Sequence, residues 1–139
     1  MKIALVAGGH LPIPPQGWGG VEHLIWNFHN QLTERGDEVV LVNTTDLKDV
    51  VTKINNGNFD AVHLHYDQYS NIMSHINCNK KLITSHYPNL ENPEPQYLFL
   101  YDLLKNSGAH IVCLSDRIEK EFVNRGCDST NVSILPCGI

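Results

Sequence analysis

A loop rich in glycine and proline, residues 8–20, contains the first residues whose types and spacing could bind a ligand. It ends in Gly19 and Gly20, immediately before an apolar pattern of helical period that begins at Val21. Both glycines therefore lie at a predicted helix N-terminus, where free N–H groups and the helix dipole favour an anion such as a phosphate. A tight strand-to-helix turn without a ligand would explain the same two residues, and the sequence leaves both interpretations open.

The spacing of these glycines does not match two common nucleotide-binding motifs. The loop is longer than a G-x-G-x-x-G turn, and the second predicted strand ends in Asn43 instead of the acidic residue that holds a ribose hydroxyl. No G-K-[ST] sequence is present, so the loop is not a P-loop. The sequence therefore disfavours a small NAD-binding or ATP-binding protein of either type.

Histidines stand at the ends of two neighbouring predicted strands. His63 and His65 are two residues apart on one apolar run and so point to the same face, while His86 follows the next run. Two histidines on one face could bind a metal, but no third ligand is evident, so we favour histidines that are hydrogen-bonded at a strand terminus. His86 could donate a hydrogen bond to a substrate oxygen or act as an acid or base.

The elements that must position these residues alternate along the chain. Short apolar runs predict six strands, at Ile3–Ala7, Glu38–Val42, Ala61–Leu64, Lys81–Thr84, Ile111–Leu114 and Val132–Leu135. Helices are expected between them, at Gly20–Arg35, Asp46–Asn56, Gln68–Ile76, Glu94–Asn106 and from Ser115 or Asp116 to Asn124 or Arg125. This alternation predicts an α/β fold, a Rossmann-like three-layer domain with a mainly parallel sheet of about six strands. Ligands of such sheets bind beyond the carboxyl ends of the strands.

Composition limits the class of protein. The 139 residues suit one domain with its own core, and the net charge of −5 lacks the basic footprint of a nucleic-acid binder. Four cysteines without a C-x-x-C pair are expected to be free thiols instead of zinc ligands or disulfides. No run approaches the roughly 18 apolar residues that a membrane span needs. The apolar stretch Tyr97–Leu104 predicts a buried helix, or else a surface that docks on a partner domain or a membrane.

Taken in order, several motifs of this chain resemble the N-terminal domain of the family 4 glycosyltransferases, the group 1 enzymes of GT-B architecture. The resemblance covers nearly the whole chain, and its most specific segment is Gly17-Trp18-Gly19-Gly20-Val21-Glu22. The other motifs are Lys2–Val6, Pro14-Pro15, Leu32–Val39, Phe59–His65, Thr84-Ser85-His86, Cys113-Leu114-Ser115 and Ile134–Ile139. The chain departs from the family pattern at Asp37, where the family usually has histidine, and at Cys137 in the hinge, where it usually has asparagine. The change at Asp37 is expected to be a surface change.

The resemblance implies a retaining transferase that uses a nucleotide-sugar donor and needs neither a metal nor a separate cofactor. The chain has no D-x-D sequence, so metal-dependent sugar-nucleotide chemistry built on such a pair is not supported. On this resemblance, Gly19 and Gly20 lie beside the donor diphosphate, and His86 is the catalytic residue that approaches the transferred sugar or the acceptor. The residues expected to line the acceptor side of the cleft are Gln16, Gly17, Trp18, Glu22, His65 and Ser115.

The same resemblance assigns residues 1–139 to the acceptor-side domain alone, which ends at the hinge, with the C-terminal donor-binding domain absent. The acceptor is expected to be a glycan, a lipid-linked sugar or a small molecule, and the span is expected to be inactive without a second domain. The partners implied are a separate donor-binding domain or further copies in a homo-oligomer.

The competing hypothesis is a non-catalytic module that keeps the fold and binds a glycan or assembles with a partner. A cytoplasmic location is expected, and a lipid-linked acceptor would bring the protein to the cytoplasmic membrane face as a peripheral contact. The net charge of −5 gives no electrostatic support for binding anionic lipid.

Overall fold

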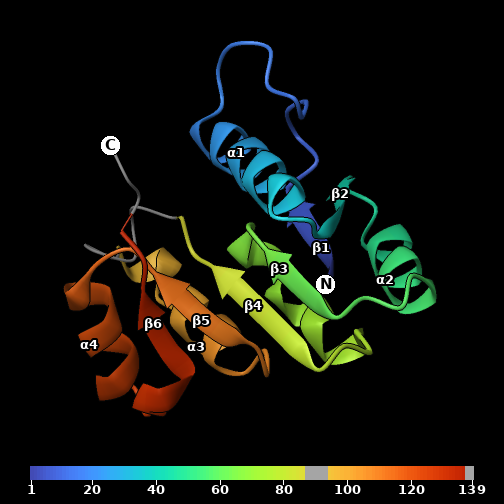
Figure 1. Cartoon of the computed structure of the whole chain (residues 1–139). Helices are drawn as coiled ribbons and strands as arrows, with labels where there is room; N and C mark the ends of the chain where they lie inside the picture. Colours follow the sequence, from blue (N-terminus) through green and yellow to red (C-terminus); the bar gives the residue numbers. More distant parts are fainter. Residues whose placement is uncertain (87–93, 137–139) are drawn as a thin grey trace.

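The computed structural model describes residues 1–86 and 94–136, which are built around one six-stranded sheet (Figure 1). Its strands are all parallel and lie in the order β2-β1-β3-β4-β5-β6. Their bounds are β1 (Lys2–Ala7), β2 (Glu38–Asn43), β3 (Ala61–Leu64), β4 (Lys80–Thr84), β5 (His110–Cys113) and β6 (Val132–Ile134). Each strand agrees within one residue with its sequence prediction, so the α/β Rossmann-like fold is confirmed.

Helical segments connect the strands. They are α1 (Gly20–Glu34), α2 (Leu47–Asn56), α3 (Phe99–Lys105) and α4 (Asp116–Asn124), with 3-10 segments η1 (Asp67–His75), η3 (Pro95–Tyr97) and η4 (Ser129–Asn131). The side chain of Asp46 caps α2 by accepting hydrogen bonds from two backbone N–H groups of its first turn. Ser115 caps α4 in the same way by accepting from the N–H of Ile118. Both helix starts were predicted from the sequence.

Two predicted helices differ from the structure. The stretch expected as a helix at Gln68–Ile76 is the 3-10 segment η1, in which the hydroxyls of Ser70 and Ser74 each donate to the carbonyl three residues earlier. Such bonds to the backbone compete with α-helical pairing and favour a tighter turn. The helix expected at Glu94–Asn106 divides into η3 and α3, because its first turn uses three-residue bonds such as Tyr97 N–H to the Glu94 carbonyl.

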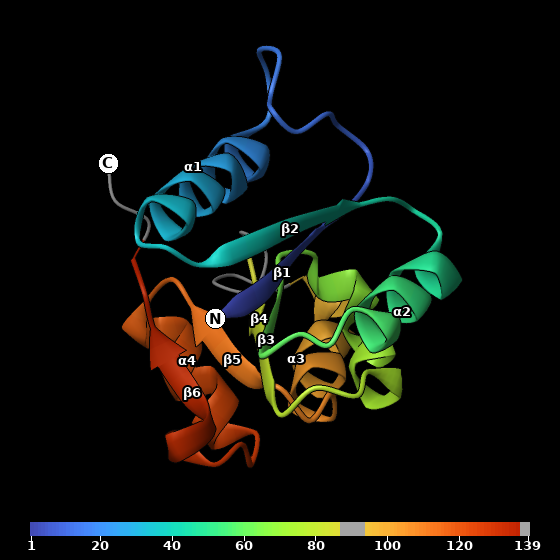
Figure 2. The ribbon, with the colours of Figure 1, turned by 45° about the vertical axis from the view of Figure 1, so that its right-hand side comes forward.

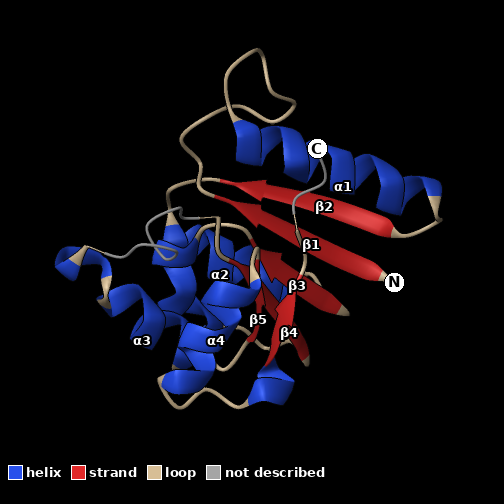
Figure 3. Cartoon of the chain, turned by 90° about the vertical axis from the view of Figure 1, so that its left-hand side faces the viewer, coloured by secondary structure: helices blue, strands red, loops and turns tan. Residues whose placement is uncertain are grey.

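The helices divide unequally between the two faces of the sheet. Helix α1 covers one face, where the residues Ile3, Leu5, Ala7, Ile25 and Ala61 form a small core. The larger core on the opposite face takes side chains from α2, η1, α3 and α4. Figure 2 and Figure 3 show α1 on one side of β1 and β2, with α2 and α3 on the other. Among the described residues, α1 is the only helix on its face, so the same face of β4–β6 carries no helical cover there.

Helix α3 contains most of the apolar stretch Tyr97–Leu104. Leu100, Tyr101 and Leu104 are fully buried in the larger core, whereas Phe99 is 53% exposed. The prediction of a buried helix is therefore confirmed for one face of α3. No helix of the described chain is both long enough and apolar enough to cross a membrane.

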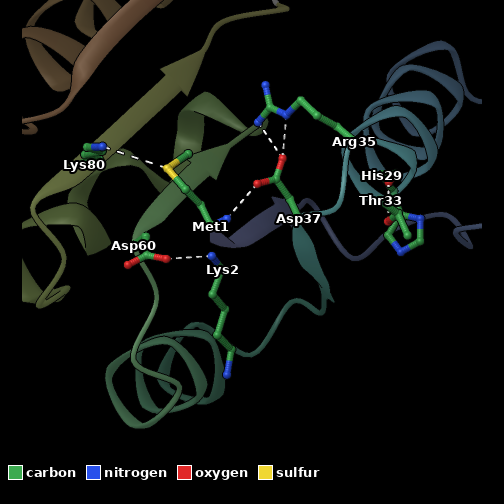
Figure 4. A network of polar contacts seen from close by, with 8 residues as sticks. All are labelled: Met1, Lys2, His29, Thr33, Arg35, Asp37, Asp60 and Lys80. Atoms are coloured by element: carbon green, nitrogen blue, oxygen red, sulfur yellow. Dashed lines mark hydrogen bonds and ion pairs between the residues drawn. The ribbon is translucent and has the colours of Figure 1, made fainter.

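A polar network ties the start of β1 to its neighbours (Figure 4). One carboxylate oxygen of Asp37 lies 2.7 Å from the amino-terminal nitrogen of Met1, and the other accepts a hydrogen bond of 2.7 Å from Nε of Arg35. These two hydrogen bonds, first the one from the amine, hold the pKa of Asp37 below its ordinary value. The backbone N–H of Lys2 donates to Asp60 at 2.7 Å. Asp37 thus joins the end of α1 to β1 and is more than the surface change expected from the sequence.

The described cysteines agree with the prediction of free thiols. Cys78 is half-buried, and Cys113 and Cys127 are buried, all three without a disulfide. Burial raises the pKa of the Cys113 thiol to about 11. Cys137, the hinge residue that departs from the family pattern, lies outside the described residues.

Candidate functional site

The loop between β1 and α1 is fastened to the sheet near its start. The N–H of Gly9 donates to Oδ1 of Asn43 at 2.9 Å, and Nδ2 of Asn43 donates to the carbonyl of Leu11 at 2.8 Å. The hydroxyl of Tyr69 donates to the carbonyl of Gly8 at 2.9 Å. Gly9 has φ of +79°, and a Cβ there would lie 2.3 Å from the carbonyl carbon of Thr44, so only glycine fits. These contacts fix the path by which the loop leaves the sheet.

The two glycines predicted to bind a phosphate lie at the start of α1. Gly19 is its N-cap, with φ of +129°, and Gly20 is its first residue. A Cβ on Gly20 would meet no atom within 4 Å, so the helix terminus is open on that side. A Cβ on Gly19 would lie 2.6 Å from Oε2 of Glu22, which places a carboxylate beside the same terminus. The Glu22 carboxylate already uses part of the favourable dipole, and an anion would bind on the open side, by Gly20.

Three histidines form a contiguous cluster where β3 and β4 end. Nδ1 of His65 lies 3.1 Å from Nε2 of His86, and the two rings stack with their centroids 5.4 Å apart. Nε2 of His63 lies 2.6 Å from Oγ1 of Thr84, and the His63 and His65 ring centroids are 3.9 Å apart. The ring of Phe28, on α1, contacts both His63 and His65. The prediction of histidines hydrogen-bonded at a strand terminus is confirmed.

Burial keeps these imidazoles uncharged at neutral pH. It lowers the pKa of both His63 and His86 to about 4, and a charge on His86 would lower that of His63 further. Burial, followed by the proximity of the other two rings, holds the pKa of His65 well below its ordinary value. The cluster can therefore donate and accept hydrogen bonds, but it supplies no positive charge to a ligand near pH 7.

A buried carboxylate lies beside the cluster. Asp67, the first residue of η1, is 5% exposed, and its Oδ2 accepts a hydrogen bond of 2.8 Å from the hydroxyl of Ser85. Ser85 directly precedes His86, so this bond joins the chain just after β3 to the chain just after β4. Burial raises the pKa of Asp67, although the hydrogen bond from Ser85 opposes the shift.

Open space surrounds His86 on the face that α1 leaves partly uncovered. A hollow of about 440 Å³ lies along the first two turns of α1, and smaller ones of about 170 Å³ and 130 Å³ lie beside it. His86 lines all three, and we refer to them together as the His86 hollows. Their other lining residues are Gly8, Gly20, Val21, His23, Leu24, Asn27, Phe28, His65, Tyr66, Asp67, Thr84, Leu114, Leu135 and Pro136. The lining is mostly apolar with a few converging polar groups, which is typical of a small-molecule site.

The residues predicted for the site fall into two groups. Gly20, His65 and His86 come together around the His86 hollows, with Gly19 and Glu22 at the adjoining helix terminus. The residues predicted to line the cleft that do not line these hollows are Gln16, Gly17, Trp18, Glu22 and Ser115. Trp18 is 91% exposed, and the carbonyl of Gly17 accepts a hydrogen bond of 2.9 Å from Nε2 of His23. The hydroxyl of Ser115 is used to cap α4.

Sequence reasoning missed three residues that shape the site. Asp67 and Tyr69 were not singled out, and Asn43 was noted only because it is not the acidic residue that a dinucleotide-binding fold has at that position. Their partners are 18, 34 and 61 residues away in the chain, so no local pattern identifies them. The signal that did exist was position, because Asn43 and Asp67 both follow the carboxyl ends of strands. Within the described residues no group of three histidine, cysteine, aspartate or glutamate side chains is arranged to hold a metal ion.

The sheet order and the crossovers define an α/β domain of Rossmann-like type, and its hollows lie at the edge where sheets of this type bind ligands. No protein-family model matches the chain, and no curated protein sequence matches it. Among solved structures it is similar to AviGT4, a glycosyltransferase involved in avilamycin A biosynthesis, with a TM-score of 0.51 and 14% identity. The match covers 97% of this chain and 63% of that chain. At this identity the likeness concerns the fold, and this chain spans less than two thirds of that protein's length.

Proposed function

We propose that this chain is the acceptor-side domain of a retaining, nucleotide-sugar-dependent glycosyltransferase of GT-B architecture. The observation that carries the proposal is that His86 lines every one of the hollows between the start of α1 and the ends of β3 and β4. The fold likeness to a glycosyltransferase over 97% of the chain supports the same class. The motif set around Gly17–Glu22 adds independent support from the sequence.

The roles proposed for the residues follow from their chemistry. In a retaining transfer, the bond between the sugar's anomeric carbon and the diphosphate oxygen breaks, and a bond to the acceptor oxygen forms on the same face of the ring. The acceptor's proton is passed to the departing phosphate. The backbone N–H groups at Gly19 and Gly20 would stabilise the charge that grows on that phosphate, from the open side of the helix terminus. His86, which is neutral, would hold a hydroxyl of the transferred sugar or of the acceptor.

The lining of the His86 hollows indicates the class of acceptor. The His86 hollows combine an apolar wall with uncharged imidazoles and the Asp67 carboxyl group, which suits a sugar ring more than an anion. A glycan, a lipid-linked sugar or a small hydroxylated molecule is therefore proposed as the acceptor. No cofactor is required in this scheme, since the nucleotide sugar is a substrate.

The test is a transfer assay on the protein made from its complete natural reading frame. Release of nucleoside diphosphate is measured with UDP-, GDP- and dTDP-sugars against a panel of glycan and lipid-linked acceptors. We expect His86→Ala to lower the rate about a hundredfold, because a positioned hydrogen-bonding group in the site is lost. His110→Ala is the matched control, because it also removes a hydrogen-bonded imidazole, whose Nε2 lies 2.7 Å from the hydroxyl oxygen of Ser133, but at the opposite end of the sheet.

Two results would count against the proposal. If no donor is consumed and no glycan binds, the protein is not a glycosyltransferase domain. If glycans bind in the His86 hollows without transfer from any donor, the non-catalytic glycan-binding module becomes the better description. Equal loss of rate in His86→Ala and His110→Ala would show that the effect is one of folding.

A further inference from the structure

One nitrogen of the histidine cluster has no partner. His65 is 2% exposed, and its Nε2 makes no hydrogen bond within the described residues. Its other nitrogen, Nδ1, lies 3.1 Å from Nε2 of His86. The second nitrogen of His86, Nδ1, also makes no hydrogen bond with a described residue, but His86 is only half-buried and lines the His86 hollows.

The bond between the two rings can be made in two ways. Each neutral imidazole carries one N–H and one bare nitrogen, so one ring donates across the 3.1 Å contact and the other accepts. If His86 donates from Nε2, then His65 must carry its own proton on Nε2, where it is buried without an acceptor. If His65 donates from Nδ1, its Nε2 is a bare nitrogen that needs no acceptor.

The buried nitrogen distinguishes the two arrangements. A buried N–H without an acceptor is rare in folded proteins and costs the desolvation of that group. The rings of Phe28 and His63 contact the His65 ring, with centroids 5.8 Å and 3.9 Å from that of His65. An aromatic ring can pack against a bare nitrogen, but it accepts a hydrogen bond from an N–H group only weakly. For His86 the choice is nearly neutral, because its half-buried ring lines the His86 hollows and can bond water or ligand there in either form.

We infer that His65 is a positioning residue, which donates from Nδ1 to Nε2 of His86 and so fixes the proton of His86 on Nδ1. His86 therefore presents an N–H, and not a bare nitrogen, to whatever occupies the hollows. Such a group recognises an oxygen by donating to it and does not remove a proton from a hydroxyl. The tautomer stands independently of any reaction; its meaning for an acceptor or donor sugar rests on the proposed function.

The tautomer is measured directly by long-range proton–nitrogen NMR of the histidine rings near pH 7, where each ring is neutral. We expect His86 to show a protonated Nδ1 and a bare Nε2 in the unmodified protein. In His65→Leu the donor is lost, and His86 should revert to the Nε2–H form that free histidine prefers. His65→Asn is the conservative variant, because its amide reaches the position of Nδ1 and can still donate, so His86 should keep the proton on Nδ1.

The controls separate this effect from loss of fold. The ring signal of His110, which is hydrogen-bonded to Ser133 away from the His86 hollows, should be unchanged in every variant. If His65→Leu does not fold, the spectra of the unmodified protein and of His65→Asn still decide the question. A protonated Nε2 on His86 in the unmodified protein overturns the inference, as does a His65→Leu protein whose His86 tautomer is unchanged.

Transfer activity is a second measurement, and its outcome can be distinguished from that of the tautomer measurement. If the complete protein transfers sugar, His65→Leu should lower kcat/KM about tenfold, as expected for a misdirected hydrogen bond, and His65→Asn should restore most of it. Absence of transfer would contradict the proposed function while leaving the tautomer result intact. An unaltered kcat/KM in His65→Leu, with the tautomer changed, would overturn the part that assigns the N–H to substrate recognition.

Discussion

The carboxamide of Asn43 joins the end of β2 to the loop that follows β1, and both its oxygen and its nitrogen form hydrogen bonds to that loop. Oδ1 accepts from the N–H of Gly9 at 2.9 Å, while Nδ2 donates to the carbonyl of Leu11 at 2.8 Å. A carboxylate could accept the first bond but could not donate the second. An amide therefore stands where a dinucleotide-binding fold has an acidic residue, and it sets the direction of the loop that leads to α1.

Replacing Asn43 with alanine should loosen this loop. Both loop contacts are lost and partly buried backbone groups are left without partners, so we expect a fall of about 2 kcal/mol in the free energy of unfolding. Limited proteolysis should cut between residues 9 and 19 much faster than in the unmodified protein. Urea denaturation measures the first effect and mass spectrometry of the fragments the second.

The matched control for that experiment is Asn55→Ala. Asn55 also makes two backbone contacts, to the carbonyl of His75 at 2.9 Å and from the N–H of Asn77 at 2.8 Å, but these lie away from the loop. Because these two contacts are exposed, we expect a smaller loss of stability, without faster cleavage of the loop. Equal cleavage in both variants would show that Asn43 has no special part in holding the loop.

Stability should depend on pH through the histidine cluster. His63 and His86 have pKa values of about 4 in the folded chain against an ordinary value of 6.5, so between these values the unfolded chain binds more protons. Protonation therefore favours unfolding, and stability is lost as the pH falls through this window. By pH 5 the loss is about 2 kcal/mol for each of the two histidines.

Urea denaturation at pH 7 and pH 5 measures this dependence. Carboxyl groups also contribute at low pH, so the unmodified protein is compared with His63→Gln and His86→Gln. Each substitution should reduce the difference in the free energy of unfolding between pH 7 and pH 5. His110→Gln serves as the control and should leave it unchanged. A difference that persists undiminished in the first two variants would contradict the assignment to the cluster.

Asp67→Asn should stabilise the protein at neutral pH. Burial raises the pKa of this carboxyl group, which means that the folded chain prefers its protonated form and that stability is lost as the pH rises through the folded-state pKa. Asparagine removes the charge and keeps an oxygen that can accept from Ser85, so we expect a gain of about 1 kcal/mol at pH 7. The gain should vanish near pH 3, where the aspartate is itself protonated. A loss at pH 7 would show that the ionised carboxylate contributes favourably in the folded chain.

Gly20→Ala separates folding from ligand binding at the start of α1. A Cβ there meets no atom within 4 Å, and alanine in a helix is favoured over glycine by about 0.5–1 kcal/mol, so thermal stability should rise. The added methyl group enters the largest of the His86 hollows, and we expect weaker binding of a nucleotide sugar by the complete protein. Gly36→Ala, at a residue with φ of +98°, should instead lose stability without affecting binding. Unimpaired donor binding in Gly20→Ala would place the diphosphate elsewhere.

The sequence was informative where structure depends on local pattern. The runs of β-branched residues predicted all six strands, and Asp46 and Ser115 were predicted as candidate helix caps because capping needs only neighbouring N–H groups. The helix type of Asp67–His75 was missed, because the serine hydroxyls that tighten it bond in a way that apolar periodicity does not reveal. The site was predicted in outline from the positions of Gly20, His65 and His86. Its supporting contacts were not, since Asn43 and Asp67 act on residues far away in the chain.

The strand order has a consequence for how the domain is assembled as it is synthesised. β1 pairs with β2 and then with β3, after which β4, β5 and β6 each pair with the strand made just before it. Every strand after β1 pairs with a strand that has already been made. The sheet can therefore grow from β3 toward β6 in the order in which the ribosome releases the chain. Ribosome-bound chains arrested after β4 should already protect β1 from proteolysis, while the edge of β4 that β5 will cover is still exposed.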